Sequence, residues 1–195
     1  IPIGISPEQA FVQILDPATG TGTFLVEVID LIYKTMTERW RKEGSMELTL
    51  TNLWNEYVPK HLLPRLHGYE LMMAPYAIAH MKIGLKLTET DYHFESKERA
   101  RVYLTNALEP TSDSQTRMAS IPALAREVQE VNKIKRDQCF TVVIGNPPYS
   151  VNSQNRNEWI QDLIFDFKKD LNERKLNLDD DFIKFFRLAD HLLSS

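Results

Sequence analysis

Short apolar runs separated by longer helical patterns organise this chain of 195 residues. The runs predict four strands, at residues 12–16, 66–70, 101–106 and 139–144. Apolar residues at helical spacing predict helices at about residues 22–42, within 50–64, from a first turn with Pro75 to about 87, and at 121–136, 158–171 and 180–193. The polar stretches 88–100 and 110–120 are predicted to be loops. This alternation predicts a single α/β domain over residues 1–195, with a doubly wound, mostly parallel sheet and flanking helices.

The run from Cys139 to Ile144 gives the clearest strand signal, because it is continuous, apolar and β-branched. These properties predict a central strand of a parallel sheet. The run leads directly into a proline-rich segment, Gly145-Asn146-Pro147-Pro148-Tyr149-Ser150. Because the carboxyl ends of parallel strands share one edge of the sheet, this segment is expected to lie on the same edge as the turn after the first strand.

A glycine-rich turn joins the first predicted strand to the first long helix. It reads Asp16-Pro17-Ala18-Thr19-Gly20-Thr21-Gly22-Thr23-Phe24. Gly20 and Gly22 permit positive φ angles and a close approach of a ligand to the backbone, and the helix start offers free N–H donors. The turn lacks the third glycine of the dinucleotide fingerprint and the lysine of a P-loop. Taken alone, it fits a structural turn as well as a cofactor site.

Composition and charge limit the functional classes to which this chain can belong. The net charge of −4 argues against a self-sufficient nucleic-acid binder, since neutralising phosphates requires an excess of Lys and Arg. No window approaches about 18 uncharged apolar residues and no secretory signal is visible, so a cytoplasmic protein without a membrane partner is predicted. The single Cys excludes a disulfide framework, and the five His residues lack the spacing of a zinc site, so no metal is expected. A start at Ile1 rather than Met suggests a fragment.

The glycine turn followed by Asn146-Pro147-Pro148-Tyr149 resembles the motif pair of S-adenosylmethionine-dependent amino-methyltransferases. With the glycine turn first, the order is similar to that of the gamma group of adenine-N6 DNA methyltransferases. Two later segments, Ser150 to Trp159 and Asp180-Asp181-Phe182-Ile183-Lys184-Phe185, look like those of the bacterial single-chain Type ISP restriction-modification enzymes. The resemblance implies a Rossmann-like class I methyltransferase fold that is incomplete at both ends. The helix before the first strand, the last strands and the target-recognition region would be missing.

The resemblance also implies which residues hold S-adenosylmethionine. Glu70, at the end of the second strand, would accept hydrogen bonds from the ribose hydroxyls. Asp16 would receive the methionine ammonium directly or through water, and Asn106 would face the adenine amine, where many members carry Asp. Phe24 would pack either against the cofactor or into the core, and the core is the favoured position. The implied cofactor-binding residues are Asp16, Pro17, Ala18, Thr19, Gly20, Thr21, Gly22, Thr23, Glu70, Leu71, Asn106 and Ala107.

The proline-rich segment carries the candidate catalytic residues Asn146, Pro147, Pro148 and Tyr149. An exocyclic amine conjugated to a purine is a poor nucleophile. The Asn146 side-chain oxygen and the Pro147 carbonyl would accept its two N–H bonds and favour the positive charge that develops on nitrogen. Successive prolines stiffen the loop. Tyr149 would offer a ring face to the target base, which must leave the duplex to reach such a site.

Double-stranded DNA is the expected partner, contacted mostly by regions outside this fragment. Nuclease, translocase and target-recognition segments of the same polypeptide are further expected partners. Two alternatives stay open. The same Asn-Pro-Pro-Tyr loop serves protein-glutamine and some RNA-guanine methyltransferases, and the acidic charge also suits a non-catalytic, cofactor-binding fragment.

Overall fold

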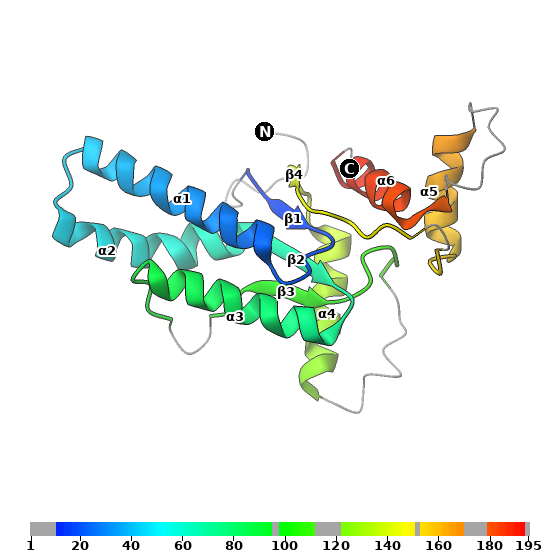
Figure 1. The fold of residues 1–195 in the computed structure, drawn as a ribbon, viewed down its shortest axis with the longest axis horizontal. Coiled ribbons are helices and arrows are strands. Elements are labelled where there is room, and N and C mark those ends of the chain that lie inside the picture. The colour runs from blue at the N-terminus through cyan, green and yellow to red at the C-terminus, as the bar shows by residue number, and fades with distance from the viewer. Residues whose placement is uncertain (1–10, 95–97, 112–121, 151–152, 170–178, 194–195) are drawn as a thin grey trace.

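The computed structural model describes residues 11–94, 98–111, 122–150, 153–169 and 179–193 (Figure 1). The elements follow in the order β1 (Ile14–Asp16), α1 (Thr23–Lys42), α2 (Glu47–Tyr57), η1 (Val58–Leu62), η2 (Leu63–Arg65), β2 (Leu66–Glu70), α3 (Met73–Glu89), β3 (Arg101–Leu104), α4 (Pro122–Asp137), β4 (Val142–Val143), α5 (Glu158–Lys168) and α6 (Asp181–Leu193). Most of the predicted loop 110–120 and the end of the predicted helix 158–171 lie outside the described residues. Among the helices described, none is long and apolar enough to cross a membrane.

The four described strands form one sheet in the order β3-β2-β1-β4, and every pairing is parallel. In β1, Ile14 lies opposite Leu66 of β2 on one side and opposite Val142 of β4 on the other. The chain therefore advances from β1 through β2 to β3 and then returns to the far side of β1. This reversal between β1 and β4 is a topological switch point, the position at which open parallel sheets bind ligands beyond their carboxyl ends.

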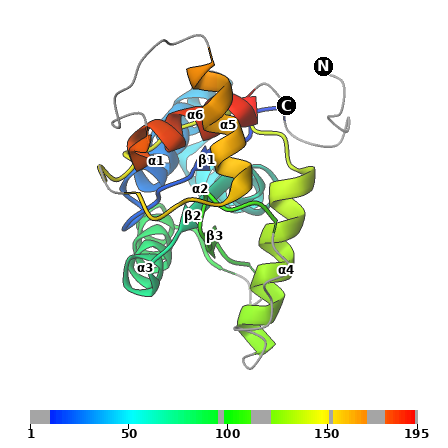
Figure 2. The same cartoon turned by 90° about the vertical axis from the view of Figure 1, so that its right-hand side faces the viewer.

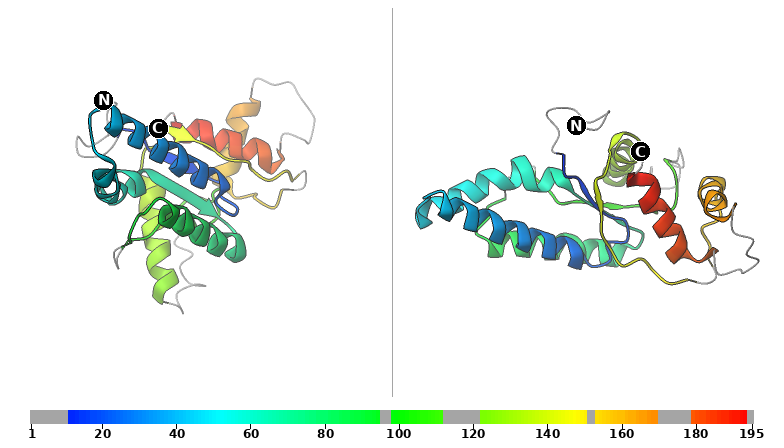
Figure 3. Two further views of the ribbon diagram at one scale, coloured as in Figure 1. Left: turned by 60° about the vertical axis from the view of Figure 1, so that its left-hand side comes forward. Right: turned by 90° about the horizontal axis from the view of Figure 1, so that it is seen from above.

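Helices α1, α2 and α3 cover one face of the sheet (Figures 1 and 3). The core on this face joins the strand residues Ile14, Leu66 and Val102 to the helical residues Leu25 and Ile83. In each strand the next residue along points to the opposite face, because side chains alternate with a period of two. The first core is therefore built from one set of alternate strand positions.

Helices α4, α5 and α6 contribute to a second core on the other face. Figure 2 shows α3 and α4 on opposite sides of β2 and β3. Here Leu15 and Tyr103, the sequence neighbours of Ile14 and Val102, pack with Val131 of α4, Ile160 of α5 and Leu188 of α6. Helices on both faces of an all-parallel sheet confirm the predicted doubly wound α/β fold.

The fourth strand differs from the prediction. It comprises only Val142 and Val143 rather than residues 139–144, and it lies at an edge of the described sheet rather than at its centre. The side chain of Val142 is 40% exposed. Part of the apolar run has another explanation, because Phe140 packs into the second core before the strand begins. A continuous apolar run indicates that a segment is buried. It does not indicate whether the strand has a neighbour on both of its edges or on only one.

Residues 47–65 contain more helix than predicted, since α2, η1 and η2 follow one another into β2 without a loop. Pro59 and Pro64 lie in the first turns of η1 and η2, where a missing N–H is tolerated. In the predicted loop 88–100, Tyr92 is buried in the first core. Hydrophobic packing therefore extends into both stretches that the sequence pattern assigned wholly or partly to loops.

Candidate functional site

The glycine turn lies at the carboxyl end of β1, beside the switch point. Gly20 and Gly22 have φ angles of 55° and 79°, in the left-handed region that favours glycine. A Cβ added at Gly22 would lie 3.2 Å from the Ala79 Cα of α3. Within the described part of the chain no side chain caps α1, and the first turn of this helix holds no acidic residue. The turn therefore needs its glycines for its own shape and also leaves the first N–H groups of α1 open to an anionic or polar ligand.

Glu70, the last residue of β2, is bound to this turn. The backbone N–H of Gly20 donates to Glu70 Oε2 at 2.8 Å, and the N–H of Met72 donates to Oε1 at 2.7 Å. A carboxylate offers about four lone-pair sites, so each oxygen can accept one further hydrogen bond. The structure thus places Glu70 next to the turn, as the strand order predicted, with acceptor capacity left for a ligand.

Asp16, the last residue of β1, is completely buried. Its Oδ1 accepts the N–H of Ala18 at 3.1 Å, whereas Oδ2 has no hydrogen-bond partner among the described residues. Burial raises the pKa of Asp16 to about 7; the hydrogen bond from Ala18 opposes this rise, and the charge of Glu70 adds to it. An unsatisfied buried acceptor is costly. The pair Asp16 and Glu70 therefore fits a ligand that carries a cationic group and neighbouring hydroxyls.

The proline-rich segment meets the glycine turn directly, because β4 and β1 are neighbours. The N–H of Ile144 donates to the carbonyl of Leu15 at 2.9 Å. At the next residue, a Cβ added to Gly145 would lie 2.6 Å from Asp16 Oδ1 and 3.7 Å from Pro17 Cδ. The two motifs, which lie far apart in the sequence, are thus in contact at a glycine that leaves room for the Asp16 carboxylate.

We expect Gly145→Ala to lower the free energy of unfolding by about 1–3 kcal/mol, since the added methyl group must displace a buried carboxylate. Gly84→Ala is the matched control. An added Cβ at Gly84 of α3 would meet nothing within 4 Å, and alanine is favoured in helices, so this variant should be neutral or slightly stabilised. Denaturant unfolding measures both, and equal stabilities would show that the two loops do not pack as described.

Asn146 and Tyr149 project from the loop that follows β4. Both side chains are exposed, and that of Tyr149 is 75% exposed. One face of the Tyr149 ring is already stacked on Phe182 of α6, with ring centroids 4.9 Å apart and planes at 16°. The loop passes beside α6 in Figure 1. The catalytic and stacking roles predicted for these residues stay predictions.

The loop after β3 holds Asn106 in a network. Its amide nitrogen donates to Asn155 Oδ1 at 2.8 Å and to Glu109 Oε1 at 3.1 Å, while its oxygen accepts the N–H of Leu108 at 3.0 Å. The neighbouring Ala107 is 6% exposed and packs in the second core. Both residues therefore have structural contacts of their own, and their predicted contacts with a cofactor remain untested.

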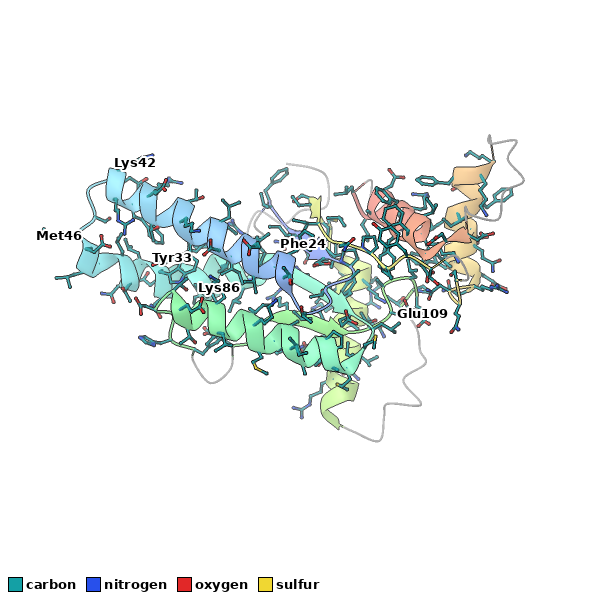
Figure 4. The ribbon with its side chains drawn as sticks, viewed as in Figure 1. Phe24, Tyr33, Lys42, Met46, Lys86 and Glu109 are labelled. Atoms are coloured by element: carbon teal, nitrogen blue, oxygen red, sulfur yellow. The ribbon has the colours of Figure 1, made fainter. Side chains whose placement is uncertain are left out.

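Two apolar side chains near the glycine turn are exposed to solvent. Leu71, next to Glu70, is 65% exposed. Phe24 was predicted to be a core residue, but it is 38% exposed at the start of α1 (Figure 4). The buried residues of α1 are Leu25, Ile29 and Thr37, so Phe24 lies one position away from the buried side of the helix. Thr23 is also exposed, and its hydroxyl accepts a hydrogen bond from Lys82 at 3.1 Å.

A buried polar cluster that the sequence pattern did not predict connects residues 153–155 to α6. Ser153 Oγ donates to Asp181 Oδ1 at 2.5 Å, and Lys184 Nζ donates to Ser153 Oγ and to the carbonyl of Asn155, both at 2.6 Å. Lys184 is 3% exposed, and burial lowers its pKa. The available signal was the position of Asp181 and Lys184 on the same helical stripe as the buried Leu188.

Comparisons with known proteins show the family and the fold of the chain. The model of the family described as "MmeI, DNA-methyltransferase domain" matches residues 7–194. A nuclease-deletion mutant of the Type ISP restriction-modification enzyme LlaGI, in complex with a DNA substrate mimic, is similar at 25% identity and a TM-score of 0.70, over 98% of this chain and 15% of that one. The DrdV–DNA complex is similar at 26% identity and a TM-score of 0.61, over 98% and 17%.

The ATP-dependent Type ISP enzyme LlaBIII, bound to DNA, has the same fold, with 22% identity and a TM-score of 0.71 over 100% of this chain and 12% of that one. The chain thus spans only 12–17% of the length of these three proteins. No curated protein matches it.

Proposed function

The chain belongs to the family of MmeI-type DNA-methyltransferase domains, and on that premise we propose that it transfers a methyl group from S-adenosylmethionine to the N6 amine of an adenine flipped out of DNA. The observation that carries this proposal is the contact between the two motif loops at Asp16 and Gly145, with Glu70 bound to the same turn. These contacts support a cofactor site with two acidic residues beside a loop of hydrogen-bond acceptors at the switch point of the sheet.

The residues around the glycine turn fit S-adenosylmethionine, which supplies the methyl group when bound. Asp16 would hold the methionine ammonium, because its Oδ2 is buried and lacks a hydrogen-bond partner among the described residues. Glu70 would hold the ribose hydroxyls with the lone pairs that Gly20 and Met72 leave free. The exposed Leu71 would cover the adenine ring.

The pKa of Asp16 makes the proposal testable through pH. The free protein keeps Asp16 protonated below about pH 7, whereas a bound ammonium favours the carboxylate. Binding then releases a proton, so affinity rises with pH between about pH 6 and about pH 7, as the carboxyl group of the free protein ionises. Calorimetry across this range measures the effect. In Asp16→Asn the pH dependence should disappear, and an unchanged pH profile would argue against contact between Asp16 and the ammonium.

The proposed chemistry at the target amine rests on the loop after β4. Asn146 and the Pro147 carbonyl would accept the two N–H bonds of the amine, which makes its lone pair available and favours the positive charge that develops on nitrogen. Asn146 is exposed on the same edge of the sheet as Asp16, which supports its access to a ligand bound there. The base would stack on Tyr149.

We propose that the domain acts as one segment of a longer single-chain restriction-modification enzyme. The three similar structures have chains several times longer, and each was solved with DNA or a DNA mimic. The net charge of −4 gives this segment little electrostatic attraction for phosphates of its own. Recognition of the DNA sequence would therefore come mainly from other parts of that polypeptide.

The test of this function uses the full-length polypeptide with cofactor that carries a labelled methyl group. It is offered DNA, RNA and protein in parallel, each at the same concentration. We expect label in DNA alone. Label in protein glutamine or in RNA would show that protein or RNA, rather than DNA, is the substrate. Label in none of the three, despite cofactor binding, would favour a non-catalytic role.

A further inference from the structure

We propose that the start of α6 holds Tyr149 as a stacking platform with one usable face, and that Phe182 is its positioning residue. The inference rests on the proposed function, because it assigns a role in capturing the flipped base. It goes beyond that function by placing part of the base-capture apparatus on α6, which lies more than thirty residues after the Asn-Pro-Pro-Tyr loop.

The first observation is the packing of three aromatic rings. Phe182 lies nearly parallel to Tyr149, with centroids 4.9 Å apart and planes at 16°. Phe186, one helical turn further on, meets Phe182 edge to face, with centroids 4.9 Å apart and planes at 62°. Phe182 is thus held between the two other rings and covers one face of Tyr149. Because Tyr149 is still 75% exposed, its other face remains open.

The second observation is a set of polar contacts between the loop and the start of α6. Asp180 Oδ1 accepts the N–H of Ser150 at 3.1 Å and the N–H of Phe182 at 2.9 Å. The N–H of Asp181 donates to the carbonyl of Ser150 at 3.2 Å. One carboxylate oxygen therefore joins the residue after Tyr149 to the residue that stacks on Tyr149. This fixes both rings relative to each other.

The third observation is that α6 is itself anchored. Lys184 and Asp181 are buried and bound to Ser153, as described above, and Leu188 packs in the second core. The platform therefore rests on a helix that is fixed to the sheet rather than on a free loop. A flipped base would meet a ring whose orientation is already set, so part of the entropic cost of capture is avoided.

Removing the Phe182 ring should therefore weaken capture of the base more than it slows the chemical step. In the full-length enzyme we expect Phe182→Ala and Phe182→Leu to weaken base capture by about 3- to 10-fold, the range of an aromatic pair. Base capture is measured by the fluorescence of 2-aminopurine. This probe replaces the adenine that the wild-type enzyme methylates. The KM for DNA should rise as base capture weakens. The kcat, the cofactor affinity and the melting temperature should stay nearly unchanged. Phe182→Tyr should retain wild-type behaviour.

The control is Phe165→Ala, which removes an exposed ring from α5 outside the stack and should change none of these quantities. A double-mutant comparison gives the decisive result. If Phe182 acts through Tyr149, Phe182→Ala should have no further effect on base capture in a Tyr149→Ala background. Additive losses, or wild-type capture in both Phe182→Ala and Phe182→Leu, would overturn the inference while leaving the proposed function intact. Absence of adenine methylation by the wild-type enzyme would overturn the function itself, and the inference with it.

Discussion

Replacing Asn146 by alanine in the full-length enzyme is expected to lower kcat for DNA methylation by roughly 10²–10³-fold, the usual cost of removing one preorganised dipole from a transition state. Asn146 lies in the loop after β4 and points to solvent, whereas the proposed cofactor residues Asp16 and Glu70 are buried at the ends of β1 and β2. The loss should therefore appear in turnover, with the affinity for S-adenosylmethionine nearly unchanged.

Single-turnover methylation kinetics and calorimetry measure the two quantities separately. Asn52→Ala provides a matched control, because Asn52 is an exposed asparagine on α2, on the far side of the molecule from the loop (Figure 1). It should leave both quantities at wild-type values. Full activity of the Asn146→Ala enzyme would remove the proposed acceptor from the mechanism.

Replacing Glu70 by alanine is expected to weaken the binding of S-adenosylmethionine by about 1.5–3 kcal/mol, the range of a charge-assisted hydrogen bond. The change removes the proposed acceptor for the ribose hydroxyls. It also leaves the N–H groups of Gly20 and Met72 without the carboxylate that holds them at 2.8 and 2.7 Å. Both effects act on the glycine turn and therefore on cofactor affinity.

Calorimetry of the Glu70→Ala protein gives the loss directly. Glu27→Ala, at an exposed position of α1, changes the net charge by the same amount and should bind the cofactor as the wild type does. Glu70→Gln retains one acceptor oxygen and should fall between the two. An affinity of Glu70→Ala equal to that of Glu27→Ala would place Glu70 outside the cofactor site.

The sequence predicted the features that depend on local spacing. Strand-helix alternation predicted a doubly wound, mostly parallel sheet, and the order of β1 and β2 predicted that Glu70 lies beside the glycine turn. Gly20 and Gly22 permit positive φ angles, and the structure uses this freedom at both positions. Each of these follows from residues that are close in sequence or from the rule that parallel strands share one edge.

The features that the sequence did not predict depend on pairing between distant segments. The run ending at Ile144 gave no information on how many strands flank β4. Asp180 and Asp181 lie at the start of α6, and their bonds to Ser150 and Ser153 cross about thirty residues. Helical periodicity describes which face of α6 is apolar; it does not say which loop that helix contacts.

The central claim is that this domain methylates the N6 amine of adenine in DNA, and analysis of the modified nucleosides tests it most directly. The full-length enzyme is incubated with unmethylated DNA and S-adenosylmethionine, the DNA is digested, and the nucleosides are separated by mass. The proposed mechanism predicts N6-methyladenine that is absent when the enzyme carries Asn146→Ala. Finding 5-methylcytosine without N6-methyladenine, or N6-methyladenine at the wild-type level with Asn146→Ala, would contradict it.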